Sequence, residues 1–272
     1  MRSEDGFILM NGDEFARYLA TAHVPRAVVR LQNHHTYIPG YAHFKNDNHF
    51  SLLRSMKRSH VQQRKWRDIG QNLTTFPDGT IAVCRPLAET PAAIYGANTG
   101  AMAMEHVGWF DTGEDAMTAA HKEIIVQANA LLCKRFNLVP GTESIVYHHW
   151  YDLNTGKRTN GTGVTKSCPG TAFFGGNTVQ AAQAHFIPLV QQALAGLQAG
   201  AAPAAWPALG SGAVDADALN VRDRPATSGA VLRKLRRGDR VQWFAESAAY
   251  GSMPWVRIDA SREEWVAKPY IQ

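Results

Sequence analysis

Residues 101–107 read AMAMEHV, an apolar run of strand length that carries one carboxylate, Glu105, near its end. Three further apolar runs contain β-branched residues, and they alternate along the chain with segments whose apolar residues recur at helical spacing. This alternation predicts an α/β domain with a central sheet. The other strand-like runs are residues 27–31, 80–84 and 144–147, and the helical segments are residues 12–22, 49–67, 115–136 and 178–197.

A change in composition near residue 205 divides the chain. Residues 194–212, LAGLQAGAAPAAWPALGSG, consist mostly of Ala, Gly and Pro and contain no charged residue, which is typical of a linker that follows a helix. Short alternating stretches separated by turn residues come after it and predict a small β-barrel. We therefore expect a first domain over 1–197, a linker over 198–212 and a second domain over 213–272. The expected strands of the second domain are 219–221, 231–235, 240–245, 255–258 and 264–267.

The bulk composition restricts the class of protein. A chain of 272 residues with 45% hydrophobic residues can bury a core, and its net charge of +5 favours a polyanionic partner such as wall polymer or nucleic acid without choosing between them. Cys84, Cys133 and Cys168 are an odd number without close pairing, which favours reduced thiols over a disulfide framework. The N-terminus, MRSEDGFILMNGDEF, lacks a signal-peptide core, and no apolar run approaches the roughly 18 residues that span a membrane. We expect synthesis in the cytoplasm without a signal peptide.

Two histidine pairs and one cysteine stand where strands are expected to end. The pairs lie in Asn33–Thr36 (NHHT) and Tyr147–Trp150 (YHHW), and the cysteine lies in Lys166–Gly170 (KSCPG). Imidazole and thiolate are ligands that zinc prefers, and three protein ligands with an open fourth position are typical of a hydrolytic site. Taken singly, such residues are more often structural. Together they predict a metal site of the catalytic type.

Strand alternation leaves the choice within the first pair open. Successive side chains of a strand point to opposite faces, so His34 shares its face with Arg30 and Gln32, and His35 lies on the other face. Either histidine could therefore be the ligand on this ground alone.

These motifs resemble the type-2 N-acetylmuramoyl-L-alanine amidases, the group that includes phage amidase lysozymes and animal peptidoglycan recognition proteins, over about residues 12–192. Several motifs occur in the order that the family has. The resemblance implies a mixed β-sheet flanked by helices and a zinc hydrolase that cuts the amide bond between N-acetylmuramic acid and L-alanine. The matching stretches are Asn33–Thr36 (NHHT), Trp66–Gly70 (WRDIG), Pro77–Ile81 (PDGTI), Arg85–Leu87 (RPL), Gly96–Asp111 (GANTGAMAMEHVGWFD) and Lys166–Gly170 (KSCPG).

The resemblance also implies roles for individual residues. It implies that His34, His148 and Cys168 bind zinc (Zn²⁺), while the second histidine of each pair is a neighbour or a structural residue. Glu105 matches a glutamate that acts as general base and then acid in some members, and a carboxylate in an apolar strand is costly to bury without a task. Lys166 matches a lysine directed at the tetrahedral intermediate, where an ammonium group stabilises negative charge. The alternatives are a surface salt bridge for Glu105 and a solvated loop lysine for Lys166.

The sequence departs from the family pattern at two positions. Many members have a tyrosine after Trp-x-Asp-Ile-Gly, where this chain has Gln71. Glutamine cannot transfer a proton, so we assign proton transfer to Glu105 and expect Gln71 to be at most a substrate contact. Cys84 replaces a usual glycine and is expected to be inert packing. The loop 151–165, rich in Gly, Thr and Asn, is a candidate wall of the substrate groove.

The C-terminal segment resembles the bacterial Src-homology-3 type domains, which commonly attach wall hydrolases to peptidoglycan. Its aromatic residues could form a stacking groove for a peptide or sugar, although most of them are expected in the barrel core. The motifs are Ala218–Pro225 (ALNVRDRP), Val231-Leu232, Gly238-Asp239, Trp255-Val256 and Glu264–Val266, and the aromatic residues are Trp243, Tyr250, Trp255, Trp265 and Tyr270.

The leading hypothesis is a monomeric lytic enzyme, a phage or prophage endolysin, that acts on Gram-positive peptidoglycan after release and binds neither nucleic acid nor membrane. A host autolysin or sporulation lysin would have the same chemistry. The alternative of another class is a non-catalytic peptidoglycan-binding protein. Cys168 separates the two classes, since members that have lost this ligand are generally binders. A zinc peptidase of another kind is disfavoured because the sequence has no His-Glu-x-x-His motif.

Overall fold

The computed structural model describes residues 1–199, 208–223, 225–247, 253–259 and 264–272. They form two compact units, one of Met1–Met117 with His121–Ala199 and one that contains the described residues after Ala199. The division falls inside the range predicted as a linker, of which residues 200–207 lie outside the described residues. Within the described ranges, no helix combines the length and the apolar character needed to cross a membrane.

The larger unit is built on a seven-stranded sheet in the order β1-β2-β5-β4-β6-β3-β7. The strands β4, β6, β3 and β7 run parallel to one another, whereas the pairs from β1 to β4 are antiparallel. The sheet is therefore mixed, which confirms the predicted fold class. The strands are β1 (Arg2–Glu4), β2 (Phe7–Met10), β3 (Arg30–His35), β4 (Leu73–Thr75), β5 (Ile81–Val83), β6 (Ala101–His106) and β7 (Ile145–Tyr147).

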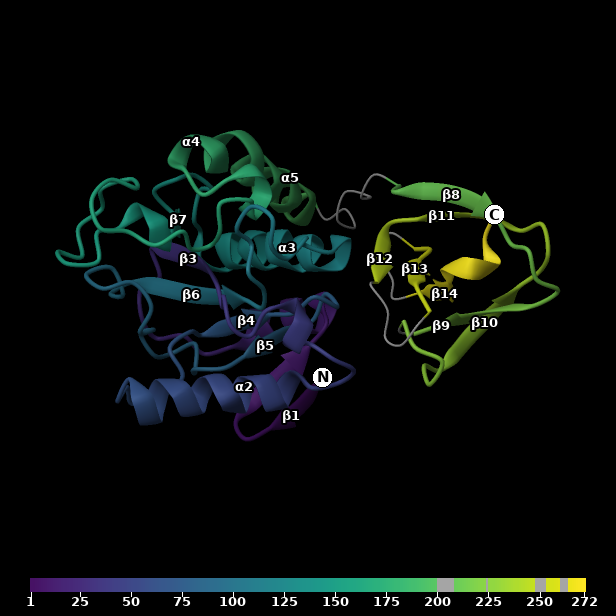
Figure 1. Cartoon of the computed structure of the whole chain (residues 1–272), viewed down its shortest axis with the longest axis horizontal. Coiled ribbons are helices and arrows are strands. Elements are labelled where there is room, and N and C mark those ends of the chain that lie inside the picture. Colours follow the sequence, from purple (N-terminus) through teal and green to yellow (C-terminus); the bar gives the residue numbers. More distant parts are fainter. Residues whose placement is uncertain (200–207, 224, 248–252, 260–263) are drawn as a thin grey trace. The chain divides into compact units, whose positions relative to one another are not determined.

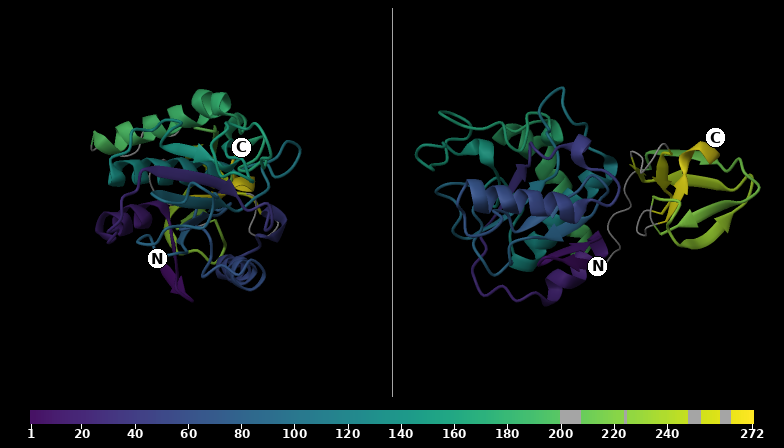
Figure 2. Two further views of the ribbon diagram at one scale, coloured as in Figure 1. Left: turned by 90° about the vertical axis from the view of Figure 1, so that its left-hand side faces the viewer. Right: turned by 60° about the horizontal axis from the view of Figure 1, so that its bottom comes forward.

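Helices cover both faces of this sheet. Helix α2 lies on one face and α3, α4 and α5 lie on the other, as Figure 1 and the left view of Figure 2 show. All four predicted helical segments are present, but the second ends at Gln63 instead of residue 67 and the third begins at Ala119 instead of residue 115. The helices are α1 (Gly12–Thr21), α2 (His49–Arg58) with the π-helical turn η2 (Ser59–Gln63), α3 (Ala119–Phe136), α4 (Val179–Ala181) and α5 (Ile187–Gln198), the last two joined by the π-helical turn η5 (Ala182–Phe186).

Apolar packing fixes α2 against the sheet. Phe50, Leu53 and Met56 recur at a spacing of three residues along one side of the helix and are buried in a cluster with Phe7 and Ala82 of the sheet. This packing holds the last turn of α2 and the π-helical turn after it beside the carboxyl ends of the parallel strands.

The observed strands differ from the predicted ones in two respects. The first predicted strand, residues 27–31, begins at Arg30 and continues to His35, so the NHH sequence lies within β3 and not after it. Strands β1, β2 and β4 were not predicted. The turn between β1 and β2 is an Asp5-Gly6 pair with φ of 52° and 84°, the two-residue hairpin signal that the sequence carried.

Buried polar side chains join α3 to the sheet. Asn129 Nδ2 donates to Asn33 Oδ1 at 3.0 Å, and Asn33 Oδ1 lies 3.0 Å from His106 Nε2. Thr75 Oγ1 lies 2.8 Å from His106 Nδ1 and 2.7 Å from His121 Nε2. His121 is a fully buried residue of α3. Burial lowers the pKa of His121 to about 3, so this side chain is neutral in the folded protein.

The C-terminal unit consists of short strands around an apolar core. Its sheets have the orders β10-β9-β14-β13-β12 and β11-β8, and their inward residues Val221, Val256 and Val266 are fully buried. Each predicted strand is present, and β8 shows that the predicted linker ends before Gly210. The strands are β8 (Gly210–Ala213), β9 (Leu219–Arg222), β10 (Val231–Leu235), β11 (Arg240–Trp243), β12 (Ala245–Ser247), β13 (Trp255–Arg257) and β14 (Trp265–Ala267), followed by the 3-10 turn η6 (Lys268–Tyr270).

The described aromatic residues of this unit do not form one exposed groove. Trp255 and Trp265 are buried, as expected of core residues, whereas Trp243 is half-buried and the exposed fraction of Tyr270 is 43%. Tyr250 lies outside the described residues.

The neutral His121 predicts acid sensitivity of the fold. Its folded pKa is below that of an unfolded histidine, about 6.5, so its stabilising contribution is complete above pH 6.5 and is lost as the pH falls toward 3. His121→Gln should reduce the pH dependence of the free energy of unfolding in this range by up to about 1.4 kcal/mol per pH unit. Urea denaturation followed at 222 nm measures it, because α1–α5 all lie in residues 1–199. His23→Gln, at an exposed position, is the control, and an equal slope in all three proteins would contradict the prediction.

Candidate metal centre

Three segments far apart in the sequence bring His34, His148 and Cys168 together. His34 lies near the end of β3, His148 directly follows β7 in the 3-10 turn η3 (His148–Trp150), and Cys168 lies in the loop before the 3-10 turn η4 (Phe173–Gly175). All three are buried, and one ligand atom from each lies within 4.8 Å of the other two. The carboxyl ends of parallel strands meet at one edge of the sheet, so β3 and β7 deliver their histidines to the same place.

The spacing of these atoms fits a tetrahedral zinc site. His34 Nδ1 lies 3.2 Å from His148 Nδ1 and 3.5 Å from Cys168 Sγ. Zinc bonds of about 2.0–2.1 Å to nitrogen and about 2.3 Å to sulfur at tetrahedral angles separate two nitrogens by about 3.4 Å and nitrogen from sulfur by about 3.6 Å. These two distances are therefore close to those between ligands of one zinc ion, and the cluster could hold a metal.

The protonation of the imidazoles also suits a cation. Burial lowers the pKa of His34 well below its ordinary value, and the nearby His148, His106 and Lys166 add to the effect. Burial lowers the pKa of His148 to about 3. Both rings are therefore neutral and have a lone pair to offer. Burial raises the pKa of the Cys168 thiol, and a cation at this position would favour its thiolate.

The second histidine of each pair has a different environment. His35 Nδ1 accepts a hydrogen bond from Phe110 N at 3.2 Å, and His149 Nδ1 lies 2.7 Å from the carbonyl oxygen of Lys166. Neither belongs to the cluster of His34, His148 and Cys168. The geometry therefore favours His34 over His35 as the ligand from β3, and His149 supports the backbone of the cysteine loop.

Asp111 holds the loop that carries Cys168 from both sides. Its Oδ2 accepts from Ser167 Oγ at 2.9 Å, and its Oδ1 accepts from Thr171 N at 2.9 Å. On the opposite side of the loop, Asn177 Nδ2 donates to the carbonyl oxygen of Ser167 at 2.7 Å. The sequence motif included Asp111, but its role as a clamp depends on contacts across 56 residues and was not predicted.

A cavity of about 460 Å³ opens on the three candidate ligands. Glu105 and Lys166, the two residues predicted to take part in catalysis, also line it. The parallel register of β3 and β6 sets His34 directly opposite Glu105, and the next strand sets Thr74 on the other side of Glu105. The remaining lining residues are His35, Thr36, Tyr37, Ile38, Met56, Ser59, His60, Arg64, Trp66, Ala92, Ala93 and Ser167.

The environment of Glu105 raises its proton affinity. Desolvation raises the pKa of this carboxyl to about 7, and the nearby charges of Lys166 and Arg64 oppose the rise. Among the described residues, Glu105 has no hydrogen-bond or ion-pair partner, so the alternative of a surface salt bridge has no support there. A carboxyl group with a pKa near neutrality can both accept and release a proton.

The cavity includes residues that the sequence analysis missed. His60 lies in the π-helical turn η2, Arg64 directly follows this turn, and Tyr37 and Ile38 follow β3. His60 Nδ1 accepts from Gly70 N at 3.0 Å, and desolvation lowers the pKa of His60 to about 4. Only the packing of α2 against the sheet brings its last turns to the cavity, and no local pattern signals it.

Two expectations about substrate contacts are wrong. Gln71 is fully buried, donates to Thr74 Oγ1 at 3.0 Å and does not line the cavity, because it faces the core between the sheet and α2. No residue of the loop 151–165 lines the cavity either. Asp152 folds this loop on itself by accepting from Thr155 N at 2.8 Å and from Val164 N at 2.9 Å. Cys84 is buried beside Thr74, in agreement with a packing role.

Comparisons with known proteins identify the C-terminal domain and structural neighbours of the larger one. Residues 217–272 match the family described as bacterial SH3 domain, which confirms that prediction. A search of curated proteins finds no match to the chain. The similar solved structures include peptidoglycan recognition proteins and N-acetylmuramoyl-L-alanine amidases, the two kinds that the motifs indicated.

The similarities to these structures are distant. Drosophila PGRP-LB is 18% identical over 55% of this chain and 79% of its own, with a TM-score of 0.45. The amidase LysC from Clostridium intestinale URNW is 20% identical over 54% of this chain and 80% of its own, with a TM-score of 0.40. The endolysin amidase LysCS from the same organism is 20% identical over 56% of this chain and 91% of its own, with a TM-score of 0.39.

The ligand geometry predicts the metal content of a cysteine variant. Cys168→Ala should weaken zinc binding at least about 100-fold, since the loss of a supporting residue alone commonly costs 10- to 100-fold and this change removes a ligand. Titration of metal-free protein with zinc against a competing chelator measures the affinity. Cys133→Ala, a buried cysteine of α3 outside the cluster, should bind zinc like the wild type. Unchanged affinity in Cys168→Ala would overturn the ligand set.

Proposed function

We propose that this protein is a zinc-dependent N-acetylmuramoyl-L-alanine amidase, which hydrolyses the amide bond between N-acetylmuramic acid and L-alanine in peptidoglycan. The observation that carries the proposal is the convergence of His34 Nδ1, His148 Nδ1 and Cys168 Sγ at tetrahedral spacing, in a cavity shared with Glu105 and Lys166. The family motifs supply the identity of the substrate. The SH3 match supports attachment to the wall as the task of the second domain.

The proposed mechanism assigns one task to each group of the cavity. His34, His148 and Cys168 hold zinc, which when bound polarises a carbonyl group and lowers the pKa of water. Glu105 takes a proton from the attacking water and later gives a proton to the departing amine of L-alanine. A pKa near 7 suits both steps, because the carboxylate is present in part at neutral pH and its acid form can donate. Lys166 places a positive charge near the developing oxyanion.

The non-catalytic alternative is less well supported. A protein that only binds peptidoglycan needs neither a buried cluster of three side chains able to hold a metal nor a desolvated carboxyl group without a partner among the described residues. With Gln71 turned into the core, Glu105 is the proton-transfer group that our proposal requires. We propose a lytic enzyme of the endolysin kind that acts on Gram-positive walls, on the ground that it combines an amidase with a wall-binding module.

Digestion of purified Gram-positive peptidoglycan tests the reaction. The products should be peptides with a free N-terminal L-alanine and intact glycan strands, identified by mass spectrometry. Chelation of zinc should abolish their release, and added zinc should restore it. Cuts confined to the glycan or to the interpeptide bridge would refute the proposed bond, and absence of any cut in zinc-loaded protein would favour the binding alternative.

The role of Glu105 predicts a separation of metal binding from turnover. Glu105→Gln should keep bound zinc but lower kcat by about 100-fold or more, the usual contribution of a general acid–base group. Glu143→Gln is the matched control, since its side chain is 88% exposed and its partner is Arg158 on the surface. Zinc content and the rate of release of L-alanine amino groups are measured on the same samples. Turnover equal to that of the wild type would remove Glu105 from the mechanism.

A further inference from the structure

Two consecutive strands of the C-terminal unit do not pair with each other. Strands β10 and β11 are separated by only the four residues 236–239, a connection that ordinarily forms a hairpin. Here β10 ends one sheet and pairs with β9 alone, while β11 pairs with β8 alone. Within the described part of the chain, each of the two strands therefore has one edge without a strand partner.

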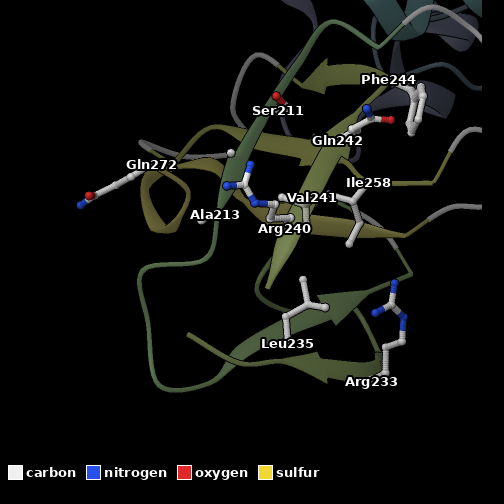
Figure 3. A pocket seen from close by; sticks show the side chains of 11 residues that line it. Ser211, Ala213, Arg233, Leu235, Arg240, Val241, Gln242, Phe244, Ile258 and Gln272 are labelled. Carbon is white, nitrogen blue, oxygen red and sulfur yellow. The ribbon is translucent and has the colours of Figure 1, made fainter. Parts of the chain in front are cut away.

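A pocket of about 790 Å³ lies between these two strands. Figure 3 shows Leu235 of β10 reaching across it toward Val241 of β11 and toward Ile258. Leu235 and Val241 belong to the apolar core, so the pocket is an opening into the side of the barrel with an apolar floor. We call it the β10–β11 pocket. The other lining residues are Ser211, Gly212, Ala213, Arg233, Arg240, Gln242, Phe244 and Gln272.

The charged side chains that line the β10–β11 pocket are all positive. Arg233 and Arg240 approach it from different strands, and no acidic side chain is among its lining residues. Arg233 bonds to Glu264 through Nε at 3.0 Å. Arg240 has no hydrogen bond or ion pair within the described part of the chain. An exposed guanidinium group beside an apolar floor is suited to a ligand that combines a carboxylate with small apolar groups.

The nearby acidic groups do not compete for Arg240. Asp215 and Asp217 bind Arg237, and Asp239 accepts from the backbone N–H of Arg236. Arg240, where the free edge of β11 begins, therefore has no ion-pair partner among the described residues.

We propose that the β10–β11 pocket binds an extended peptide that carries a free carboxylate, with Arg240 holding the carboxylate. The two free strand edges offer backbone hydrogen bonds to an added strand, and the floor accepts methyl-sized side chains. A phosphodiester polymer would use the arginines but neither the floor nor the strand edges. That the peptide is the stem of peptidoglycan rests on the proposed function, whereas recognition of a carboxylate peptide does not.

The experiment uses the full chain and a simple probe. N-acetyl-trialanine with a free carboxylate is titrated into protein labelled at the methyl groups of Leu, Val and Ile, which include Leu235, Val241 and Ile258. These methyl signals should shift on binding. The C-terminal amide of the same peptide should bind at least about tenfold more weakly, because it lacks the charge that Arg240 recognises. Equal binding of acid and amide, or shifts confined to other methyl groups, would overturn the proposal.

Two charge variants test the role of Arg240. Arg240→Gln should lower the affinity for the free acid at least about tenfold, while Arg236→Gln, an exposed neighbour that does not line the pocket, should lower it less than twofold. Equal effects of the two variants would indicate general attraction to positive charge and would refute the pocket. Glycerol phosphate is the competing source of negative charge, and tighter binding of this probe than of the peptide would refute the peptide as ligand.

Sedimentation with peptidoglycan tests the stem peptide as the natural ligand. Both variants are compared for binding to purified peptidoglycan freed of phosphate polymers, with Glu105→Gln added to prevent digestion. Arg240→Gln should reduce binding at least about fivefold relative to Arg236→Gln. Equal binding would refute the stem peptide as the ligand. The amidase reaction is measured separately, so its failure would leave the titration result unaffected.

Discussion

The parallel pairing of β3 with β6 and β7 is the constraint on which the rest of the site depends. It aligns Asn33 with Tyr147 and His34 with Glu105, so the residue after β7, His148, arrives beside His34. Side chains of a strand alternate between faces, and a shift of one residue would move His34 to the opposite face. Every distance in the candidate metal centre follows from this register, together with the loop that Asp111 clamps around Cys168.

Strands β3 and β6 serve two different purposes on their two faces. On the face toward α3, Asn33, Thr75 and His106 form a buried hydrogen-bonded network with His121. On the face toward α2, the neighbouring residues line the cavity, where Glu105 stands without a partner. Polar groups whose hydrogen bonds are satisfied stabilise the structure. A buried titratable group without a partner has a shifted pKa, which suits it to proton transfer. Two adjacent histidines of one strand, such as His34 and His35 of β3, can therefore have entirely different roles.

In the described part of the second domain, the same contrast holds for backbone groups: most strand edges are paired, whereas β10 and β11 each have one edge without a strand partner. Its strands close most of a barrel, but β10 and β11 diverge and leave an apolar opening bordered by Arg240. A short peptide held there would bind weakly by itself. For the proposed amidase, weak binding would be sufficient, because each contact with the polymer would keep the larger domain at a high local concentration of substrate bonds.

The sequence by itself determined the α/β class, the four helical segments and the C-terminal SH3 domain, and it singled out three residues that the structure brings into one cluster able to hold a metal. These features are local, since helical periodicity, linker composition and the letters of a motif lie within short stretches. The short strand β4 (Leu73–Thr75) has no such signal, because three residues show no periodicity. Only the tertiary structure turned Gln71 into the core, brought His60 and Arg64 to the cavity and left the loop 151–165 out of it. It also agrees with the choice of His34 over His35 that the resemblance implied. The physical reason is that strand register and helix packing decide where a side chain points, and both arise from contacts between residues distant in the chain.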